Sequence, residues 1–564
     1  MKDHNKFQFF YFRKETLIYC IHNNILIWLS LLIINSAVTS CSKASEKKKL
    51  DERANILLIV ADDLGYADLG CFGGDIETPN IDNIATSGIR FSRFHTSPLC
   101  APTRAMLLSG NDNHIAGMGN MFQSNNDFGY EGQLTNRIVT IPALLRNSGY
   151  HTYMAGKWHL GTDSLSNPHN KGFEHSFVNL LGAGNHYNDH GFDSDYPITP
   201  YTEDGKPAKW NDGDYSTDFY TDKIIKYIDQ NKGDGKPFFA FAAYTSPHWP
   251  LQVDEKYWKK YEGHYDNGYE DLREKRLESL KKAGMIPNEA VLPPLNKRVN
   301  PWGSLSIEEK KIESRKMELY AGMVDNLDFN VGRIIQHLKD IGIYENTLIV
   351  FMADNGAAAE DFYYNEHFGP FLREYFNNEY DNMGKENSFV SYGPQWAEAG
   401  TSPFKDFKGY TTEGGINTPM IIAGPKVVRK NEISDSFVTL MDLAPTFYEL
   451  AQTKYPKKFE GNELYPLKGT SLLSYLAGKT NEVHNTNYVF GIEHDQYAMV
   501  RKGKWKITNI ETPFFESNFM LYDLSKDLEE INDLKESEPE KFNEMLEEWR
   551  KFSNEIKANL NSSN

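Results

Sequence analysis

Cysteine is scarce in this sequence: the 564 residues include only four, Cys20, Cys41, Cys71 and Cys100. Small secreted domains that are held together by several disulfides are far richer in cysteine. A chain of this size must therefore be stabilised by a packed core or by a bound metal ion. Cys71 stands between Gly70 and Phe72, and we expect it to be a small buried side chain.

An excess of positive charge is also absent. The chain has 60 Lys and Arg against 78 Asp and Glu, which gives a formal net charge of −18. Binding to nucleic acid depends on clustered basic side chains, so this balance argues against a nucleic-acid partner. It does not exclude an anionic substrate, because a few cations that converge on one site can bind an anion locally.

The apolar run near the N-terminus is short. It covers residues 25–34, fewer than the ~20 residues that a membrane-spanning helix needs. Basic side chains precede it, and it is followed by Val38-Thr39-Ser40-Cys41, an ending that resembles a bacterial lipobox. We predict that residues 1–41 are a signal peptide of the lipoprotein type, lipidated at Cys41, and that residues 42–53 are a polar tether. An ordinary signal peptide with an incidental cysteine is the alternative.

Apolar and aromatic residues are plentiful, at 40% and 13% of the chain, and this predicts a large packed core. Several apolar runs end in a cluster of polar residues, which is typical of buried parallel strands that lead into a site at their carboxyl ends. These runs are residues 55–61, 149–156, 237–244 and 347–353, and residues 418–424 form a further short core strand.

Helical patterns lie between these runs, at residues 140–147, 216–231 and 306–341. The alternation predicts a three-layer α/β domain with a mixed, mostly parallel sheet, which we place at residues 54–485. Residues 486–564 are predicted to form a small C-terminal α+β subdomain, with antiparallel strands at 497–507 and 519–524 and a helix at 538–559. Residues 256–304 and 361–401 are predicted to be inserted loops.

Two pairs of polar residues follow buried strands: Asp62-Asp63 and Asp354-Asn355. Oxygen ligands of this kind suit a hard cation, Ca²⁺ before Mg²⁺. The chain lacks the histidine-and-carboxylate clusters that are typical of zinc sites. The alternative is that each pair only forms a turn or caps a helix.

Five further side chains are candidates for anion binding and proton transfer: Arg104, Lys157, His159, His248 and Lys408. Lys157 and His159 are two residues apart on a predicted extended segment, which places both side chains on the same face. Taken singly, these residues have ordinary alternatives, such as a solvated rim, a packed or capping histidine, or an exposed loop lysine. The evidence that these five residues form one site is the order in which they occur along the chain.

The segment Cys100-Ala101-Pro102-Thr103-Arg104 matches C-x-P-x-R, the signature of the type I sulfatases. The order D-D, C-x-P-x-R, G-K-W-H, S-P-H, D-N-G and K-G-x-T-x-x-G-G resembles this formylglycine-dependent family over nearly the whole mature chain. Narrower stretches resemble the bacterial arylsulfatase of the Pseudomonas type: residues 113–119, 368–370, 380–382 and 391–397. The resemblance implies an alkaline-phosphatase-like three-layer sandwich and an exported enzyme that hydrolyses a sulfate ester.

In this family a maturation enzyme oxidises the motif cysteine to Cα-formylglycine (3-oxoalanine). The resemblance therefore implies that Cys100 is an aldehyde, hydrated to a diol, in the working protein. It also implies one Ca²⁺ ion per chain, held by Asp62, Asp63, Asp354, Asn355 and the modified Cys100. With Cys41 lipidated and Cys100 oxidised, Cys71 has no disulfide partner in the mature chain.

The resemblance assigns roles to the cations and histidines as well. Arg104 and Lys157 would stabilise the charged diol, and Lys157 with Lys408 would bind the sulfate oxygens. His248 would protonate the departing oxygen, and His159 would take the proton from the second hydroxyl of the diol. The expected partners are thus a sulfated substrate, the maturation enzyme and, through the lipid anchor alone, a membrane at the bacterial periplasm or cell surface.

The substrate itself is left open between an aryl sulfate and a sulfated carbohydrate. Two alternatives to a sulfatase also stay open: a phosphomonoester or phosphonate-ester hydrolase of the same superfamily, and a catalytically dead glycan-binding lipoprotein. Six aromatic residues could line a rim that binds a ring or a sugar, or could equally belong to the core: Trp210, Trp249, Tyr363, Tyr364, Phe376 and Tyr392.

Overall fold

The computed structural model describes residues 52–121, 127–210, 213–558 and 560. The predicted leader, Cys41 and nearly all of the tether lie outside the described residues, so these assignments stay predictions. The chain divides into two compact units, and the larger one, Arg53–Lys232 with Lys236–Asn564, holds every element discussed below. Within the described part of the chain, no helix combines the length and the apolar character needed to cross a membrane.

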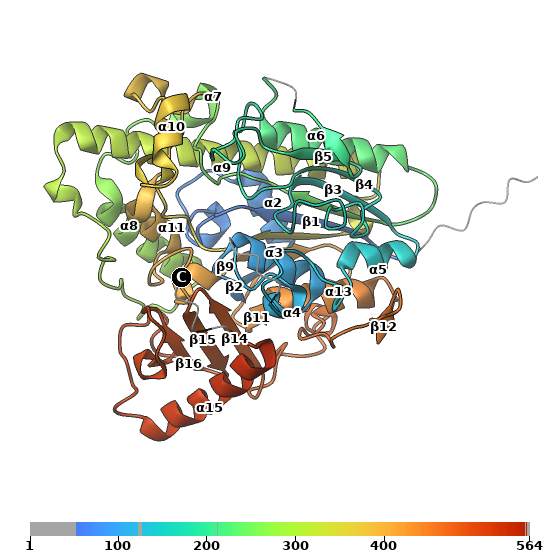
Figure 1. Cartoon of the computed structure of the whole chain (residues 1–564). Helices are drawn as coiled ribbons and strands as arrows, with labels where there is room; N and C mark the ends of the chain where they lie inside the picture. Colours follow the sequence, from blue (N-terminus) through green and yellow to red (C-terminus); the bar gives the residue numbers. More distant parts are fainter. Residues whose placement is uncertain (1–51, 122–126, 211–212, 559, 561–564) are drawn as a thin grey trace, which may run out of the picture. The chain divides into compact units, whose positions relative to one another are not determined.

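A large mixed sheet forms the centre of this unit (Figure 1). Its strands are ordered β10-β2-β9-β8-β1-β7-β3-β4-β5-β6, with β11 beside β2. The five central strands run parallel: β8 (Thr347–Ala353), β1 (Asn55–Ala61), β7 (Phe238–Ala243), β3 (His151–Lys157) and β4 (His175–Asn179). The predicted mixed, mostly parallel sheet is confirmed.

The outer strands account for the antiparallel pairs. β9 (Asn417–Ala423) runs antiparallel to β8 and to β2 (Gly88–His95), and short strands complete the two edges: β5 (Tyr201–Glu203), β6 (Lys206–Ala208), β10 (Glu432–Ser434) and β11 (Val438–Thr439). The strand β2 was not expected from the sequence. Its polar residues, such as Arg90, interrupt the apolar pattern, and the strand is held by pairing with β9 on one side and β10 on the other.

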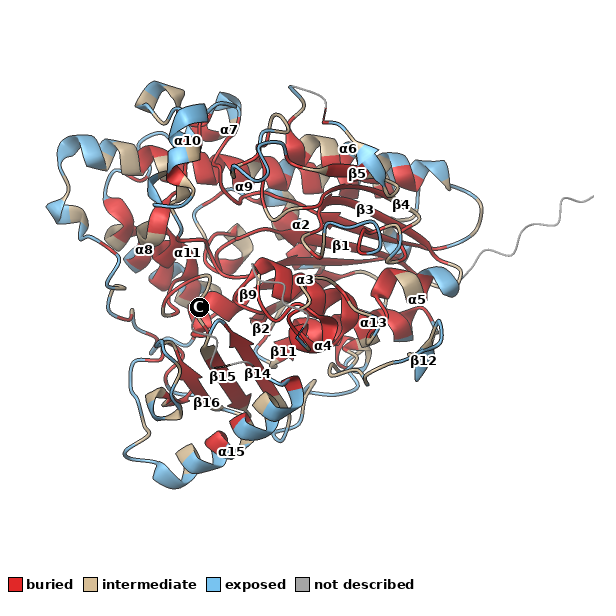
Figure 2. Cartoon of the chain, in the orientation of Figure 1, coloured by how far each residue is buried: buried red, intermediate tan, exposed pale blue. Residues whose placement is uncertain are grey.

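Both faces of the sheet are covered, which explains the unbroken apolar runs. In β1, Leu57 and Ile59 point into one core cluster, whereas Ile56 and Leu58 point into the other. The first cluster contains α2 (Pro79–Ser87), α6 (Ser216–Gln230) and α9 (Ile307–Asp340). The second contains α3 (Cys100–Ser109), α5 (Ile141–Asn147) and α13 (Leu443–Leu450). Figure 2 shows the strands buried between these helices.

The two predicted insertions contain helices as well as loops. Residues 256–304 include α8 (Gly268–Ala283), which follows the short α7 (Glu255–Trp258), and residues 361–401 include α10 (Gly369–Tyr375) and α11 (Gly393–Thr401). The expectation of inserted loops was therefore wrong for α8, α10 and α11. The high charge of α8 hid its apolar face, which buries Tyr269, Leu277 and Leu280 in the first core cluster.

Cys71 was expected to be buried and is instead only half-buried, on the short helical turn Gly70–Phe72. Among the described residues, Cys71 and Cys100 are both free cysteines. The backbone N–H of Cys71 donates a hydrogen bond to Asp82, and its carbonyl accepts one from Arg90, so the main chain of this residue is fully engaged.

The C-terminal residues form an antiparallel sheet of four strands: β14 (Val489–His494), β15 (Tyr497–Lys502), β16 (Trp505–Asn509) and β17 (Met520–Asp523). The segment 497–507, predicted as extended, is a hairpin that turns at Gly503, where φ is 59°. The last helix, α15 (Pro539–Ile556), lies beside this sheet (Figure 1). Its Met545 and Trp549 share a buried cluster with residues of the sheet. The small antiparallel sheet is thus confirmed, while the boundary at residue 485 stays a prediction.

Buried charges join this small sheet to the large one. Nζ of Lys506 on β16 lies 2.8 Å from Glu413 and 2.8 Å from Glu530, and all three side chains are at most 1% exposed. Glu413 begins α12 (Glu413–Ile416), which leads directly into β9. His95, at the end of β2, lies 2.8 Å from the other carboxylate oxygen of Glu413.

Replacing Lys506 by methionine tests this connection. The variant leaves Glu413 and Glu530 buried without their cation, and the loss of one partner from a buried ion pair costs about 3–5 kcal/mol. We expect Lys506→Met to lower the free energy of unfolding in urea by that amount. The control is Lys502→Met on β15, whose ion pairs with Glu544 and Glu548 are partly exposed and are worth less than about 1 kcal/mol. Equal losses in the two variants would contradict the connection.

Candidate active site

The order of the parallel strands brings the predicted site residues to one edge of the sheet. Asp354 follows β8, Asp62 follows β1, His248 lies beyond β7, and Lys157 ends β3. These four strands are neighbours in that order, and the carboxyl ends of parallel strands meet at the same edge. Residues that are up to about 300 positions apart in the chain therefore surround a single point, as the contacts below show.

Cys100 is the first residue of α3 and is 1% exposed. Its Sγ lies 3.7 Å from Oδ1 of Asp62 and 3.9 Å from Oδ1 of Asp63, and Nζ of Lys408 lies 3.1 Å from it. The start of the helix is held by Thr103, whose hydroxyl accepts from the Ser97 N–H and donates to the Ser97 carbonyl. Cys100 is thus fixed between two carboxylates and an ammonium group.

The pKa of the Cys100 thiol is raised to about 12, because burial outweighs the attraction of Lys157 and Lys408. An unmodified thiol at this position would stay protonated at neutral pH, and a protonated thiol is a poor nucleophile.

Asp62 and Lys157 form a fully buried ion pair. Nζ of Lys157 donates to both carboxylate oxygens of Asp62, at 2.7 and 2.9 Å, and both side chains are 0% exposed. Burial raises the pKa of Asp62 to about 7, although Lys157 opposes this shift. Such a pair persists in the interior only because each charge compensates the other.

Asp63 receives more donors than Asp62. Nζ of Lys408 lies 2.6 and 2.8 Å from its two oxygens, and Nδ2 of Asn355 donates to Oδ1 at 2.6 Å. Nε2 of His248 lies 3.3 Å from Oδ2. Burial alone would raise the pKa of Asp63, but Lys408 and then His248 outweigh it and hold the pKa below its ordinary value. The backbone of Asp63 is left-handed, with φ at 64°, and its N–H donates to Asp354.

Arg104 lies one turn after Cys100 on the same face of α3. Its guanidinium donates to Oδ2 of Asp354 at 2.9 Å and to the carbonyl of Lys157 at 3.1 Å. It also lies 3.8 Å from Asp62. Arg104 therefore links the ends of β8 and β3 to the helix that carries Cys100.

The two histidines occupy different environments. The ring of His248 lies against Asp63, and its Nδ1 is 2.7 Å from the carbonyl of Trp249, so Nδ1 carries the hydrogen because a carbonyl only accepts. His159 is partly exposed, has φ at 57°, and its buried Nδ1 finds no hydrogen-bond partner within the described structure. The pKa of His159 is lowered well below its ordinary value by burial and then by Lys157 and Arg104. Burial likewise lowers the pKa of His248.

Four of these residues could hold a metal ion together. In the described part of the chain, Asp62, Asp63, Cys100 and His248 each offer a ligand atom, and these atoms lie within 4.8 Å of one another. Oδ1 of Asn355 is buried beside them without a partner in the described structure. Asp354 was predicted as a ligand, but its two oxygens already accept from Arg104 and the Asp63 N–H. A set rich in oxygen atoms with an unused amide oxygen fits a hard divalent cation.

Two residues that shape the site were not predicted from the sequence. Thr103 falls on a variable position of the C-x-P-x-R motif, so nothing marked its role in holding Ser97. Gly182 packs against the ring of His159, and a Cβ atom at Gly182 would lie 2.4 Å from Cε1 of that ring. The segment Gly182-Ala183-Gly184 was visible in the sequence, but two spaced glycines alone do not indicate a contact with a histidine.

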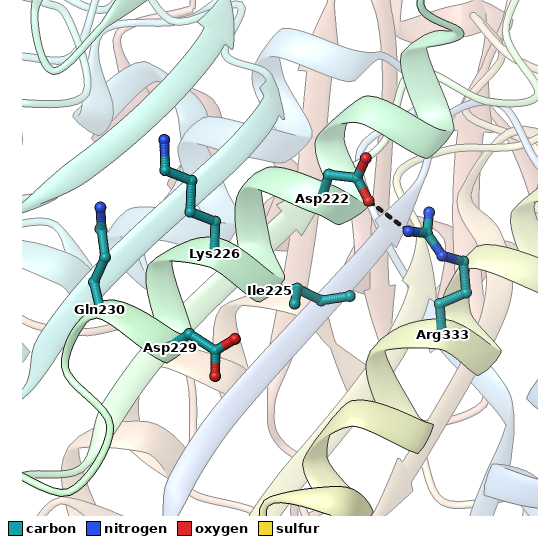
Figure 3. Close-up of a pocket in the computed structure, with 6 residues that line it drawn as sticks. All are labelled: Asp222, Ile225, Lys226, Asp229, Gln230 and Arg333. Carbon is teal, nitrogen blue, oxygen red and sulfur yellow. Dashed lines mark hydrogen bonds and ion pairs between the residues drawn. The ribbon is translucent and has the colours of Figure 1, made fainter.

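A surface hollow between α6 and α9 shares no residue with this site. It is lined by Asp222, Ile225, Lys226, Asp229, Gln230 and Arg333, none of which was predicted to act in chemistry (Figure 3). Asp222 and Arg333 face each other across it as an ion pair. The chemistry-bearing residues therefore gather at the sheet edge and not in this hollow.

Comparison with known proteins identifies the family. The sulfatase family profile matches residues 54–453, which is most of the chain. The chain belongs to the sulfatase family. A second profile, of the C-terminal region of N-sulphoglucosamine sulphohydrolase, matches residues 404–557 of this sulfatase.

Individual relatives agree with the family. An arylsulfatase of Klebsiella aerogenes is 39% identical over 75% of this chain and 91% of its own length. An uncharacterized sulfatase of Schizosaccharomyces pombe is 39% identical over 90% of this chain and 94% of its own. The crystal structure of Ps i-CgsB in complex with k-i-k-neocarrahexaose has a TM-score of 0.62 and 27% identity, and the match covers 89% of this chain and 93% of that one.

A structure described as a complex with its substrate D-glucosamine-2-N,6-O-disulfate has a TM-score of 0.60, with 90% of this sulfatase and 99% of that chain covered. At 21% identity it supports the fold alone. The family and the relatives together establish a sulfuric ester hydrolase. They do not favour the phosphomonoester alternative.

The link made by Arg104 can be tested with Arg104→Lys. A lysine keeps the charge but cannot donate to Asp354 and to the Lys157 carbonyl at once. Because such supporting contacts are worth ~10–100-fold in activity, we expect kcat/KM for 4-nitrophenyl sulfate to fall by that factor. Arg333→Lys, in the hollow between α6 and α9, is the matched control and should keep wild-type activity. Similar activity in both variants would exclude the linking role of Arg104.

Proposed function

We propose that this sulfatase is an exported enzyme that hydrolyses a sulfate ester to an alcohol or phenol and inorganic sulfate, through formylglycine at Cys100 and one bound Ca²⁺ ion. The observation that carries the proposal is the position of Cys100. It starts α3, and its Sγ lies within 4 Å of Asp62, Asp63 and Lys408. The hydrated aldehyde at this residue would supply a nucleophilic oxygen and a second hydroxyl that lets sulfate leave.

The calcium ion would be held by Asp62, Asp63, Asn355 and the modified residue 100, with Asp354 as the further ligand that the family resemblance implies. The unpaired Oδ1 of Asn355 and the shared position of the carboxylates support this set. When bound, the ion supplies Lewis-acid polarisation of a sulfate oxygen. His248 lies within the same 4.8 Å group, and we assign it to proton transfer because the family resemblance gives it that role; the Trp249 carbonyl engages its Nδ1 and leaves Nε2 facing Asp63.

Two of the three cations would bind the sulfate group, and the third would hold the site in place. Lys157 and Lys408 end at the carboxylates that flank Cys100, where each ammonium group can also donate to a sulfate oxygen. Arg104 stands behind them and keeps Asp354 and the end of β3 in place. Preorganised donors of this kind stabilise charge as it develops on the transferred group.

The two histidines are assigned to opposite proton transfers. As the bond between sulfur and the ester oxygen breaks, the doubly protonated ring of His248 would give its Nε2 proton to the departing oxygen, and Asp63, 3.3 Å from Nε2, favours that charged form of the ring. His159 then accepts a proton from the second hydroxyl as the bond between residue 100 and the sulfate group breaks. The lowered pKa of His159 and its unengaged Nδ1 support the role of an acceptor.

The leader residues support a proposed location. We assign residues 1–41 to a lipoprotein-type signal peptide, so the mature enzyme would sit at the periplasmic or outer surface of a bacterial membrane through a lipid on Cys41. Formylglycine formation also requires a maturation enzyme in the same cell. Fractionation of cells that express the wild type and Cys41→Ser tests the anchor, because the variant should move from the membrane fraction to the soluble one.

The central test of the function is the chemistry at residue 100. Co-expression with a formylglycine-generating enzyme should give a tryptic Cys100 peptide with the mass of the aldehyde and release of 4-nitrophenol from 4-nitrophenyl sulfate. Cys100→Ser should release at most one equivalent of 4-nitrophenol, because a serine sulfate ester has no second hydroxyl. Cys100→Ala should fold but release none. A preference for 4-nitrophenyl phosphate over the sulfate would contradict the proposal.

Metal removal gives an independent test. Because an unpaired buried oxygen and two carboxylates would lose their cation, we expect chelation with EGTA to lower both the melting temperature and the activity, and Ca²⁺ to restore both. Asn355→Ala should weaken the calcium-dependent rise in melting temperature. Asn365→Ala, on the exposed part of residues 361–401, is the control. A melting temperature that does not respond to Ca²⁺ in the wild type would exclude a calcium site here.

A further inference from the structure

A separate aromatic cluster stands beside the site. Phe192, Trp249, Phe362, Phe368 and Phe389 form it, and we call these five residues the aromatic wall. They come from three distant segments: the loop after β4, the turn after β7, and residues 361–401. Trp249 is central, with ring centroids 5.4 Å from Phe192, 4.6 Å from Phe362 and 5.5 Å from Phe389, and Phe368 closes the group 4.9 Å from Phe362.

One ring contact of the wall, and two links through alanines of the same cluster, connect it to the residues that would face the leaving group. The rings of His248 and Trp249 are 4.2 Å apart between centroids. Ala183 packs within the cluster and follows Gly182, which touches the His159 ring. Ala358 also belongs to the cluster, and the carbonyl of the preceding residue accepts from the Lys408 N–H at 3.1 Å.

The exposure of the site residues indicates where the substrate enters. Cys100 and Lys157 are fully buried, whereas His159 and Lys408 are each partly exposed. The leaving group of a substrate whose sulfate reaches Cys100 would therefore extend past His159 and Lys408, each of which is linked through neighbouring residues to the cluster that contains the wall. Phe192, Phe362 and Phe368 are only partly buried, so each of them exposes some apolar ring surface.

The charge around the wall limits what can lie on it. Residues 181–199 and 358–376 carry seven carboxylates and one Lys or Arg, Arg373, which donates to the Tyr363 carbonyl. Arg298 and Lys316 approach two of these carboxylates from elsewhere, at 3.0 and 4.0 Å. Carboxylates still outnumber cations by seven to three. A polysaccharide with repeated sulfate groups would be repelled here, because proteins bind such polyanions through clustered basic side chains.

We propose that the aromatic wall is the leaving-group subsite of this sulfatase, and that it selects a sulfate monoester of a small, uncharged aromatic alcohol or phenol. The proposal rests on the proposed function and adds the class of substrate to it. Aromatic rings gain affinity from offset or edge-to-face contacts with a bound ring and from the removal of apolar surface from water. A sugar ring that carries further sulfate groups gains little from this wall and is opposed by the surrounding carboxylates.

The wall also decides which of the six candidate rim aromatics face the site. Trp249 belongs to the wall, and Tyr363 packs against it. Phe376 is buried behind it against Phe389, with ring centroids 5.4 Å apart. Trp210 and Tyr392 lie in the first core cluster, and Tyr364 is 70% exposed. Of the six aromatic residues predicted as a possible rim of the site, only two therefore remain candidates: Trp249, in the wall, and Tyr363, against it.

The experiment uses the matured full-length enzyme with two probes, 4-nitrophenyl sulfate and N-acetylglucosamine 6-sulfate. The wild type should have a higher kcat/KM for the aryl ester. Phe192→Ala should raise KM for the aryl ester by about 5–20-fold with little change in kcat, because the ring contributes binding and no chemistry. Its kinetics with the monosaccharide should stay the same. Phe192→Leu should recover part of the loss, and Tyr196→Ala, on an exposed ring of the same loop, should match the wild type.

Binding of 4-nitrophenol to the Cys100→Ala protein, measured by calorimetry at pH 6, separates this proposal from the proposed function. The wall predicts that Phe192→Ala weakens this binding by a similar factor, with or without turnover. The proposed subsite would be contradicted if Phe192→Ala lost kcat/KM equally for both sulfate esters, or if it bound 4-nitrophenol as the Cys100→Ala protein alone does. A wild-type preference for the monosaccharide sulfate would also overturn it. If the matured enzyme releases sulfate from neither ester, the proposed function fails, and calorimetry still tests the aromatic subsite.

Discussion

The pairing of buried charges at the carboxyl edge of the sheet is the constraint on which the rest of the structure depends. Asp62 with Lys157, Asp63 with Lys408, and Asp354 with Arg104 form three ion pairs that are almost wholly removed from water. Removing a charge from water costs several kcal/mol unless an opposite charge replaces the solvent. The strands, α3 and the loop of Lys408 must therefore end at positions that keep every charge matched. A singly charged sulfate ester would then meet Lys157 and Lys408 at positions that these pairs already fix.

The C-terminal sheet contributes to the site through the loop that carries Lys408. The hydroxyl of Thr411 lies 2.8 Å from that of Thr508, Tyr410 stacks on Tyr497, and Glu413 pairs with Lys506. The segment from Lys408 to Glu413 is thus built against β15 and β16. This arrangement explains why a small subdomain without predicted catalytic residues accompanies the large sheet.

The central strands and long helices could be predicted from the sequence because burial on both faces leaves an apolar run that periodicity detects. The polar residues that follow those runs were found in the same way, whereas three site residues were found only through the motifs of the family resemblance: Cys100, Arg104 and Lys408. Hydrophobic periodicity did not detect the elements that owe their structure to the segments packed against them. β2 alternates polar and apolar residues and is a strand because β9 and β10 flank it. α8 is highly charged and still buries one face, including Arg276, which lies 2.7 Å from Asp68.

The sequence by itself determined the chemical groups: a motif cysteine, oxygen ligands, three cations and two histidines suited to a sulfate ester. Tertiary structure decided which of these groups meet, since Lys408 reaches Asp63 across 345 positions and Cys100 touches both. It also decided that Trp249 borders the site whereas Trp210 lies in the core. A side chain carries its chemistry wherever it stands, but proximity and burial depend on strand order and on segments that meet only in the folded chain. The preference for one sulfate ester over another likewise depends on which side chains the folded chain brings together.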